Sequence, residues 1–256
     1  MIKLENTQVV GLEAAIRGMR NPMNSWEKSD SKFAEMNCDH IHDIPGKNWW
    51  FGELEGDAEI GPNDYDLMLR LAKQGPVHGK FRRMIAVYVD ITAPLYWWKE
   101  FDTYKVGTVA NSCSTMHKIH AKEFTLDDFS HEHLFGIFNE DDHDCWVDDE
   151  NRISDLESTE ILNLTIKMLN KARTLYLEYQ KKARCGSEFA KDHVKEYWWQ
   201  MIQLLPSSYN QRRTVMLSYE VLANIYQYRR NHKLDEWREF CKWIEGLPYS
   251  EIITCS

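Results

Sequence analysis

The sequence contains no apolar run close to the roughly 20 residues that a helix needs to span a bilayer. Its six cysteines form no CxxC pair, and no low-complexity linker interrupts the chain. We therefore expect a soluble protein with reduced thiols, no membrane partner and no disulfide framework. The first residues, MIKLENTQVVGLEAAIRGM, lack the continuous apolar core of a signal peptide, so we expect a cytoplasmic location.

A basic surface is missing as well, since the net charge is −9 over 256 residues. A protein that binds polymeric nucleic acid needs a cationic face to displace counterions from the phosphates, so we expect no such partner. A local basic pocket for one small anion is still compatible with this composition. The length suits one large domain or two small ones, and without a linker we predict a single domain over 1–256.

Metal ligands occur in two places, and neither has the spacing of a metal site. Cys38, His40 and His42 lie within five residues. The two histidines would need a third and a fourth ligand, which nothing nearby supplies at a typical spacing, so we predict no metal here. The acidic region at 121–158 includes NEDDHDCWVDDEN at 139–151. It lacks the glycine and the spaced oxygen ligands of a calcium loop, which favours a solvated acidic excursion.

Tryptophan is abundant, with ten residues that include adjacent pairs at 49–50, 97–98 and 198–199. Large aromatic side chains fill protein cores and subunit interfaces, and they also stack on planar ligands. We favour a large core or a subunit interface over ligand stacking.

The stretch at 93–117, APLYWWKEFDTYKVGTVANSCSTMH, joins an aromatic helix to a polar segment. An apolar run at 84–89 predicts a buried strand before it, and Pro94 suits the first turn of a helix that extends through Tyr104. Gly107 ends this helix. The short polar side chains from Thr108 to Thr115 then either cap a turn or line a site.

The rest of the chain predicts an α+β protein. Alternation at 1–10 indicates a strand, and helical spacing follows from Leu12 and again between Gly61 and Gly75. Four helices are expected in the last third: one after a Ser158 cap, one at 188–204, one at 212–230 and one after His232. The first of these is predicted to bury one face, made of Ile161, Leu164, Met168, Ala172, Leu175, Tyr176 and Tyr179. A few strands followed by several packed helices give the α+β class.

Three blocks of the sequence resemble the flavin-dependent thymidylate synthases (ThyX). The first is DYDLMLRLAKQGPVHGKF at 64–81, which is similar to the family's helix and the loop before its central strand. The second is the stretch at 93–117. The third is LLPSSYNQRRTVMLSYEVLANIYQYR at 204–229, which is similar to the family's Leu-Pro segment and the long helix after it, with the same spacing from the proline to a closing arginine.

The family's signature motif departs from its usual residues in this chain. The family carries an Arg-His-Arg triplet, a serine further along and an arginine just beyond that serine. Aligned from Ala93 without gaps, the corresponding residues here are Thr103, Tyr104 and Lys105 for the triplet, Cys113 beside Ser114 for the serine, and Thr115 for the last arginine. Glu100 replaces a glutamine before the triplet, and Asn111 falls at or next to an Asn-Glu pair.

The resemblance implies a ThyX-like fold, which is a small antiparallel sheet with a helical C-terminal half, assembled as a homotetramer. It implies FAD as cofactor and a pyrimidine nucleotide such as dUMP as ligand. The implied reaction is one-carbon transfer to, or reduction at, the pyrimidine C5, with NADPH and methylene-tetrahydrofolate as possible further cosubstrates. By resemblance, the flavin contacts are Arg83, Tyr104, Lys105, Asn111 and Asn224. The substrate contacts are Glu100, Thr103, Thr115, Glu220 and Arg229, and the catalytic positions are Cys113 and Ser114.

Three interpretations stay open, because arginines that hold phosphates in the family are replaced here and Glu220 brings a carboxylate. In the first, the chain is a divergent flavoenzyme in which other cations supply the anion contacts, with candidates Lys105, Arg229, Arg82, Arg83, Arg212 and Arg213. In the second, the fold is kept and the ligand has changed to one that is neutral or cationic near Glu100 and Glu220. In the third, catalysis is lost and the protein serves only in assembly.

Cys113 has two interpretations. As a thiol at the position of the family's serine, it is a candidate nucleophile for the pyrimidine C6, activated by a cation such as Lys105 or His117. A small buried thiol without a chemical role is the commoner situation for a single cysteine.

Overall fold

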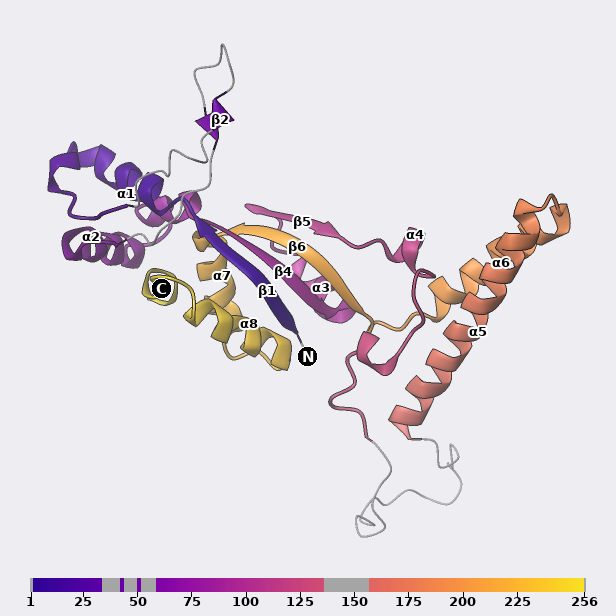
Figure 1. Cartoon of the computed structure of the whole chain (residues 1–256). Helices are drawn as coiled ribbons and strands as arrows, with labels where there is room; N and C mark the ends of the chain where they lie inside the picture. The colour runs from indigo at the N-terminus through magenta and orange to yellow at the C-terminus, as the bar shows by residue number, and fades with distance from the viewer. Residues whose placement is uncertain (1, 34–41, 44–49, 52–58, 136–156, 256) are drawn as a thin grey trace, which may run out of the picture. The chain divides into compact units, whose positions relative to one another are not determined.

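The computed structural model describes residues 2–33, 42–43, 50–51, 59–135 and 157–255 (Figure 1). The Cys38, His40 and His42 group and the acidic run at 139–151 lie outside the residues whose side chains it describes. No described helix is both long enough and apolar enough to cross a membrane.

A small antiparallel sheet and many helices give the mixed architecture that the sequence predicts. The sheet consists of β1 (Lys3–Val10), β4 (Ala86–Pro94), β6 (Asn210–Ser218) and β5 (Thr108–Ser112), in that order across the sheet. A separate antiparallel pair joins β2 (His42–Asp43) to β3 (Trp50–Phe51). The central strands bury alternate residues, such as Val87, Val89 and Ile91 of β4, because one side of each strand packs into a core.

The chain divides into two compact units. Unit 1 comprises residues 1–3, 91–103 and 111–213, and unit 2 comprises residues 4–90, 104–110 and 214–256. The single domain expected over 1–256 stays a prediction.

Unit 2 contains most of the short helices. They are α1 (Leu12–Arg20), η1 (Asn21–Met23), η2 (Trp26–Lys28), α2 (Pro62–Lys73), η4 (Gly79–Met84), α7 (Tyr219–Arg229), α8 (Asp235–Glu245) and α9 (Glu251–Thr254). α7 packs against α8, α9 and η4. Large side chains with almost no exposed surface form the core of this unit, including Met68, Tyr219, Trp237 and Phe240.

Unit 1 contains a long helical hairpin. Its helices are α3 (Leu95–Phe101), α4 (Thr115–Lys118), η5 (Leu126–Asp128), α5 (Ser158–Arg184) and α6 (Glu188–Leu204). α5 and α6 lie side by side (Figure 1) and are joined at Gly186, whose φ of +94° suits glycine. They share a core with residues 119–129, which follow α4. This core is made of Ile119, Phe124, Phe129, Leu162, Ile166, Leu169, Ala172, Tyr176 and Met201.

Several expected elements are confirmed. β1, α1 and α2 lie where the sequence predicts them, as do α6 and α8. Pro206 follows the end of α6 at Leu204 closely, as expected for a residue that disfavours helix geometry before it.

The helix expected at 212–230 is wrong in its first part. Residues up to Ser218 belong to β6, and only Tyr219–Arg229 is helical. Val215 and Leu217 are both buried at the two-residue spacing of a strand. Ser218 marks the change, because its hydroxyl accepts a hydrogen bond from the Val221 amide and caps α7.

The stretch at 93–117 also differs from its prediction. α3 ends at Phe101, so Tyr104 lies beyond the helix. Pro94 is the last residue of β4 and the N-cap of α3, one residue before the first turn of the helix. The polar segment after Gly107 is largely a strand, β5, followed by Ser114, whose hydroxyl caps α4 by accepting from the His117 amide at 2.9 Å.

The predicted face of α5 is correct at Ala172 and Tyr176, which are buried, and wrong in the first half of the helix. Ile161, Leu164 and Met168 are 52%, 48% and 51% exposed, whereas Leu162, Ile166 and Leu169 are buried. Both sets recur at helical spacing, so the pattern alone does not distinguish them. The cap of α5 is Glu157, which forms a reciprocal capping box with Glu160, and not Ser158.

Candidate functional site

The residues implied by the resemblance are distributed over both units. Unit 1 holds Glu100, Thr103, Asn111, Cys113, Ser114 and Thr115. Unit 2 holds Arg83, Tyr104, Lys105, Glu220, Asn224 and Arg229.

In unit 2, Glu220 is paired with a buried arginine. The Arg82 Nε donates to Glu220 Oε2 at 2.8 Å, and the Arg82 side chain is only 4% exposed. Arg82 Nη1 also donates to the carbonyl of Ile252 at 3.2 Å. A buried arginine needs an anionic partner, and Glu220 supplies it from the same unit.

Arg229, at the end of α7, lies against two aromatic rings of unit 2. Its guanidinium carbon is 4.8 Å from the centroid of the Trp237 ring and 5.7 Å from that of the Tyr104 ring. Its Nε donates to the Tyr104 hydroxyl at 2.9 Å. The structure therefore brings together two residues that the resemblance assigns to binding, Tyr104 and Arg229.

Three other residues of unit 2 face solvent. Arg83, Lys105 and Asn224 are exposed, so their charges or amide are accessible to a ligand. Lys105 precedes Gly107, which has a φ of +77° and lies close to Val221, where an added Cβ would be 3.2 Å from a methyl carbon. Gly107 thus allows the chain after Tyr104 to turn tightly beside α7.

Unit 1 shows a comparable arrangement around Arg213. Its guanidinium carbon lies 4.1 Å from the centroid of the Trp98 ring, and its Nη1 is 2.7 Å from Asp102 Oδ1. Trp98 is buried and donates from its indole nitrogen to the carbonyl of Gln211. Arg82 and Arg213, which the sequence offers as anion contacts, are both neutralised by carboxylates of their own unit.

The remaining site residues of unit 1 are mostly exposed. Thr103 donates from its hydroxyl to the carbonyl of Glu100 at 2.7 Å, so these two lie together. Cys113 is exposed, which differs from the buried thiol of the simpler interpretation. Its amide donates to the Arg212 carbonyl and its carbonyl accepts from the Gln211 side chain, which fixes the backbone at the thiol.

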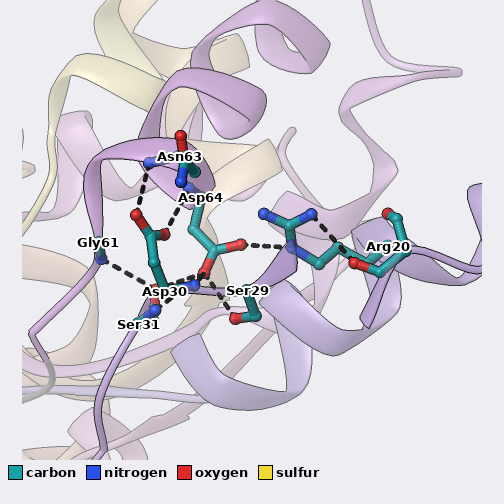
Figure 2. Close-up of polar contacts among 8 residues, drawn as sticks. Arg20, Ser29, Asp30, Ser31, Gly61, Asn63 and Asp64 are labelled. Carbon is teal, nitrogen blue, oxygen red and sulfur yellow. Dashed lines mark hydrogen bonds and ion pairs between the residues drawn. The ribbon is translucent and has the colours of Figure 1, made fainter. Parts of the chain in front are cut away.

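A polar cluster in unit 2 was not anticipated from the sequence (Figure 2). Asp64 has no exposed surface and accepts from Arg20 Nε at 2.6 Å and from the hydroxyls of Ser29 and Ser31 at 2.7 Å. Burial raises the pKa of this carboxyl, but the hydrogen bonds from Ser29, Ser31 and Arg20 outweigh it and leave the pKa below its ordinary value.

An open pocket of about 570 Å³ lies next to this cluster. Its lining includes Arg20, Lys28, Asp30 and Arg70. Asp30 accepts from the amides of Asn63 and Asp64 and so caps α2, while Arg70 pairs with Asp66. Because Asp64 pairs with Arg20 and Asp30 accepts from the first amides of α2, the cluster acts as an anchor that holds the loop before α2.

No group of three or more His, Cys, Asp or Glu side chains is placed to hold a metal ion among the described residues.

Solved structures with a similar fold are flavin-dependent thymidylate synthases ThyX from Helicobacter pylori, in complexes with FAD and dUMP. One has a TM-score of 0.58 and 14% identity, covering 99% of this chain and 98% of that chain. Another has a TM-score of 0.55 and 15% identity, covering 98% and 96%. No protein-family model and no curated protein matches the sequence. At these identities the likeness shows a shared fold.

Sequence reasoning missed the partners of the site arginines. Trp237 was expected only as a core residue of α8, and Asp102 was given no role. The sequence does not identify these partners, because an acidic residue or a tryptophan that contacts an arginine in the fold need not be near it in sequence. Asp102 is adjacent in sequence to a predicted site residue, Thr103, but Trp237 is not near one.

Proposed function

We propose that this chain is a divergent member of the flavin-dependent thymidylate synthases that binds FAD and a pyrimidine nucleoside or nucleotide. The observation that carries this proposal is the likeness in fold over nearly the whole length of both chains. The relatives with this fold were solved with FAD and dUMP bound. The proposed reaction is one-carbon transfer to, or reduction at, the pyrimidine C5.

The residues of unit 2 suit part of this cofactor. Arg83 and Lys105 are exposed cations of the kind that a diphosphate needs, and Asn224 offers an exposed amide on α7. Asn111 of unit 1 is also exposed and keeps its proposed flavin contact. When bound, a reduced flavin supplies hydride, and the protein's part is to hold and orient the ligands.

Cys113 is proposed as a nucleophile and Ser114 as its neighbour in the catalytic segment. The exposed thiol is accessible to a ligand, and hydrogen bonds fix its backbone. A Cys113→Ser variant should lose the chemical step in single-turnover assays while keeping its affinity for flavin. A variant as active as the parent would remove Cys113 from the mechanism.

Flavin binding is tested by titrating FAD into the purified protein and following the quenching of flavin fluorescence. Lys105→Gln should weaken binding, because an exposed cation near a diphosphate contributes attraction that salt screens. Lys242→Gln, which removes an exposed lysine of α8 paired with Glu239, is the matched control and should leave the affinity unchanged. Equal effects of the two variants would count against the role of Lys105.

The homotetramer, NADPH and methylene-tetrahydrofolate belong to the same proposal. Large apolar side chains at the surface support an assembly, among them Phe189 at 70% and Trp199 at 41% exposure. Protein that binds neither flavin nor pyrimidine would favour the alternative, a protein that keeps the fold for binding another ligand or for assembly.

A further inference from the structure

We propose that the pyrimidine site of unit 2 gains no affinity from a substrate phosphate, so that it binds an uncharged nucleoside about as tightly as the phosphorylated nucleotide. This inference rests on the proposed function, because it names the substrate class of the same site. Two arginines of unit 2 carry it, Arg82 and Arg229, since both are engaged by partners that a phosphate would have to displace.

The ion pair at the start of α7 is the first step. Arg82 is 3% exposed and donates to Glu220 and to the Ile252 carbonyl. A phosphate monoester brings a charge of about −1.5 to −2 near neutral pH. It would meet the Glu220 carboxylate, whose side chain is 19% exposed, before it reached the buried guanidinium. Like charges at short range oppose one another, so this end of α7 disfavours the phosphate.

The aromatic clamp at the end of α7 is the second step. Bidentate recognition of a phosphate uses neighbouring N–H groups in the plane of the guanidinium. Arg229 Nε already donates to the Tyr104 hydroxyl at 2.9 Å, and the rings of Tyr104 and Trp237 lie over the guanidinium. An anion that approaches Arg229 along the edge that includes Nε must displace the phenol before it can form that paired contact.

An uncharged pyrimidine ring is neither repelled by the Glu220 carboxylate nor dependent on the Arg229 N–H groups. A pyrimidine base is held by hydrogen bonds and by contact with apolar or aromatic surface, and these interactions do not require a free cation. Arg83 and Lys105 are proposed to hold the cofactor diphosphate, so in FAD-saturated protein they are not available to a substrate phosphate. The two engaged arginines thus remove the advantage that a phosphate gives to a nucleotide.

The inference is tested on the full chain saturated with FAD, by calorimetric titration with deoxyuridine and with dUMP at low and moderate salt. We expect the two ligands to bind within about threefold of each other, with little change between about 50 and 200 mM salt. Binding of dUMP that is more than about threefold tighter than that of deoxyuridine would overturn the inference and leave the proposed function intact.

Variants that release the arginines make the test sharper. Glu220→Gln leaves Arg82 without its anionic partner, and Tyr104→Phe removes the hydroxyl at Arg229 while keeping the ring. Each should raise the affinity for dUMP relative to deoxyuridine by about tenfold. Glu239→Gln makes the same chemical change at an exposed ion pair with Lys242 and should leave the ratio unchanged.

Failure of the inference and failure of the proposed function give different results. If Glu220→Gln does not fold, Tyr104→Phe and the ligand comparison on the parent still decide the question. Protein that binds FAD but neither pyrimidine overturns the inference and the pyrimidine part of the proposed function. Protein that binds no FAD contradicts the proposed function itself, and the inference falls with it.

Discussion

Asp64 illustrates at the scale of one residue how a buried charge is stabilised. Its carboxylate accepts from one arginine and two serine hydroxyls, and these contacts lower its pKa despite full burial. The folded pKa lies below the unfolded value of 3.8. Its contribution to stability is therefore present above pH 3.8 and is lost as the pH falls through the lower folded pKa.

Replacing Asp64 by Asn should lower the free energy of unfolding by about 3 kcal/mol at pH 7, because Arg20 is left buried without an anion. Urea unfolding measures this loss. The variant should also lose less stability than the parent below pH 3.8, since it lacks the group that titrates.

Asp66→Asn is the matched control, because Asp66 pairs with Arg70 at the surface, with both side chains more than 60% exposed. Its cost should stay under about 1 kcal/mol. Similar losses for the two variants would contradict the anchor role of Asp64.

The boundary between β6 and α7 shows, at the scale of elements, what could be predicted from the sequence. The apolar residues of α7, such as Leu222 and Ile225, recur at helical spacing, and this spacing predicts the helix. The strand before it is not predicted because Leu217 lies four residues before Val221 and so also fits the helical pattern. Only its pairing within the sheet, a long-range contact, selects the strand.

In the candidate site, too, the sequence predicts some features and not others. Individual positions such as Arg229 and Glu220 could be nominated from the resemblance, because they keep a fixed spacing from Pro206. Their pairing with Arg82 and Tyr104 could not, since Arg82 lies 138 positions from Glu220 and Tyr104 lies 125 from Arg229. Sequence spacing therefore gives the candidates, while tertiary packing decides which charges are available.

The entry to α2 gives a prediction at the element scale. A Cβ on Gly61 would lie 2.3 Å from the Asp30 carboxyl carbon, so Gly61→Ala should displace the side chain that caps α2. We expect a loss of about 2 kcal/mol in the free energy of unfolding, from the lost cap and the steric strain.

Gly186→Ala is the comparison, because nothing lies within 4 Å of its added Cβ and only the positive φ opposes the change. Its cost should be about 1 kcal/mol. Denaturant midpoints of the two variants and the parent measure both effects, and a larger loss at Gly186 would refute the role given to Asp30.

At the scale of the whole molecule, the proposed assembly has a direct measure. Light scattering on the purified protein should give a mass of four chains of 30.4 kDa, because exposed aromatic side chains favour burial in an interface. The mass should hold over a tenfold dilution if the interfaces are large. A mass of one chain at all concentrations would remove the tetramer from the proposal.

The central claim is that a chain with the ThyX fold still binds a flavin, although the cations around its site are few and partly engaged. The visible absorption spectrum of the purified protein, recorded before and after adding FAD and removing the unbound excess, tests it most directly. The account predicts a flavin band that stays with the protein and a higher melting temperature when FAD is present. A protein that stays colourless and melts at the same temperature with FAD would contradict it.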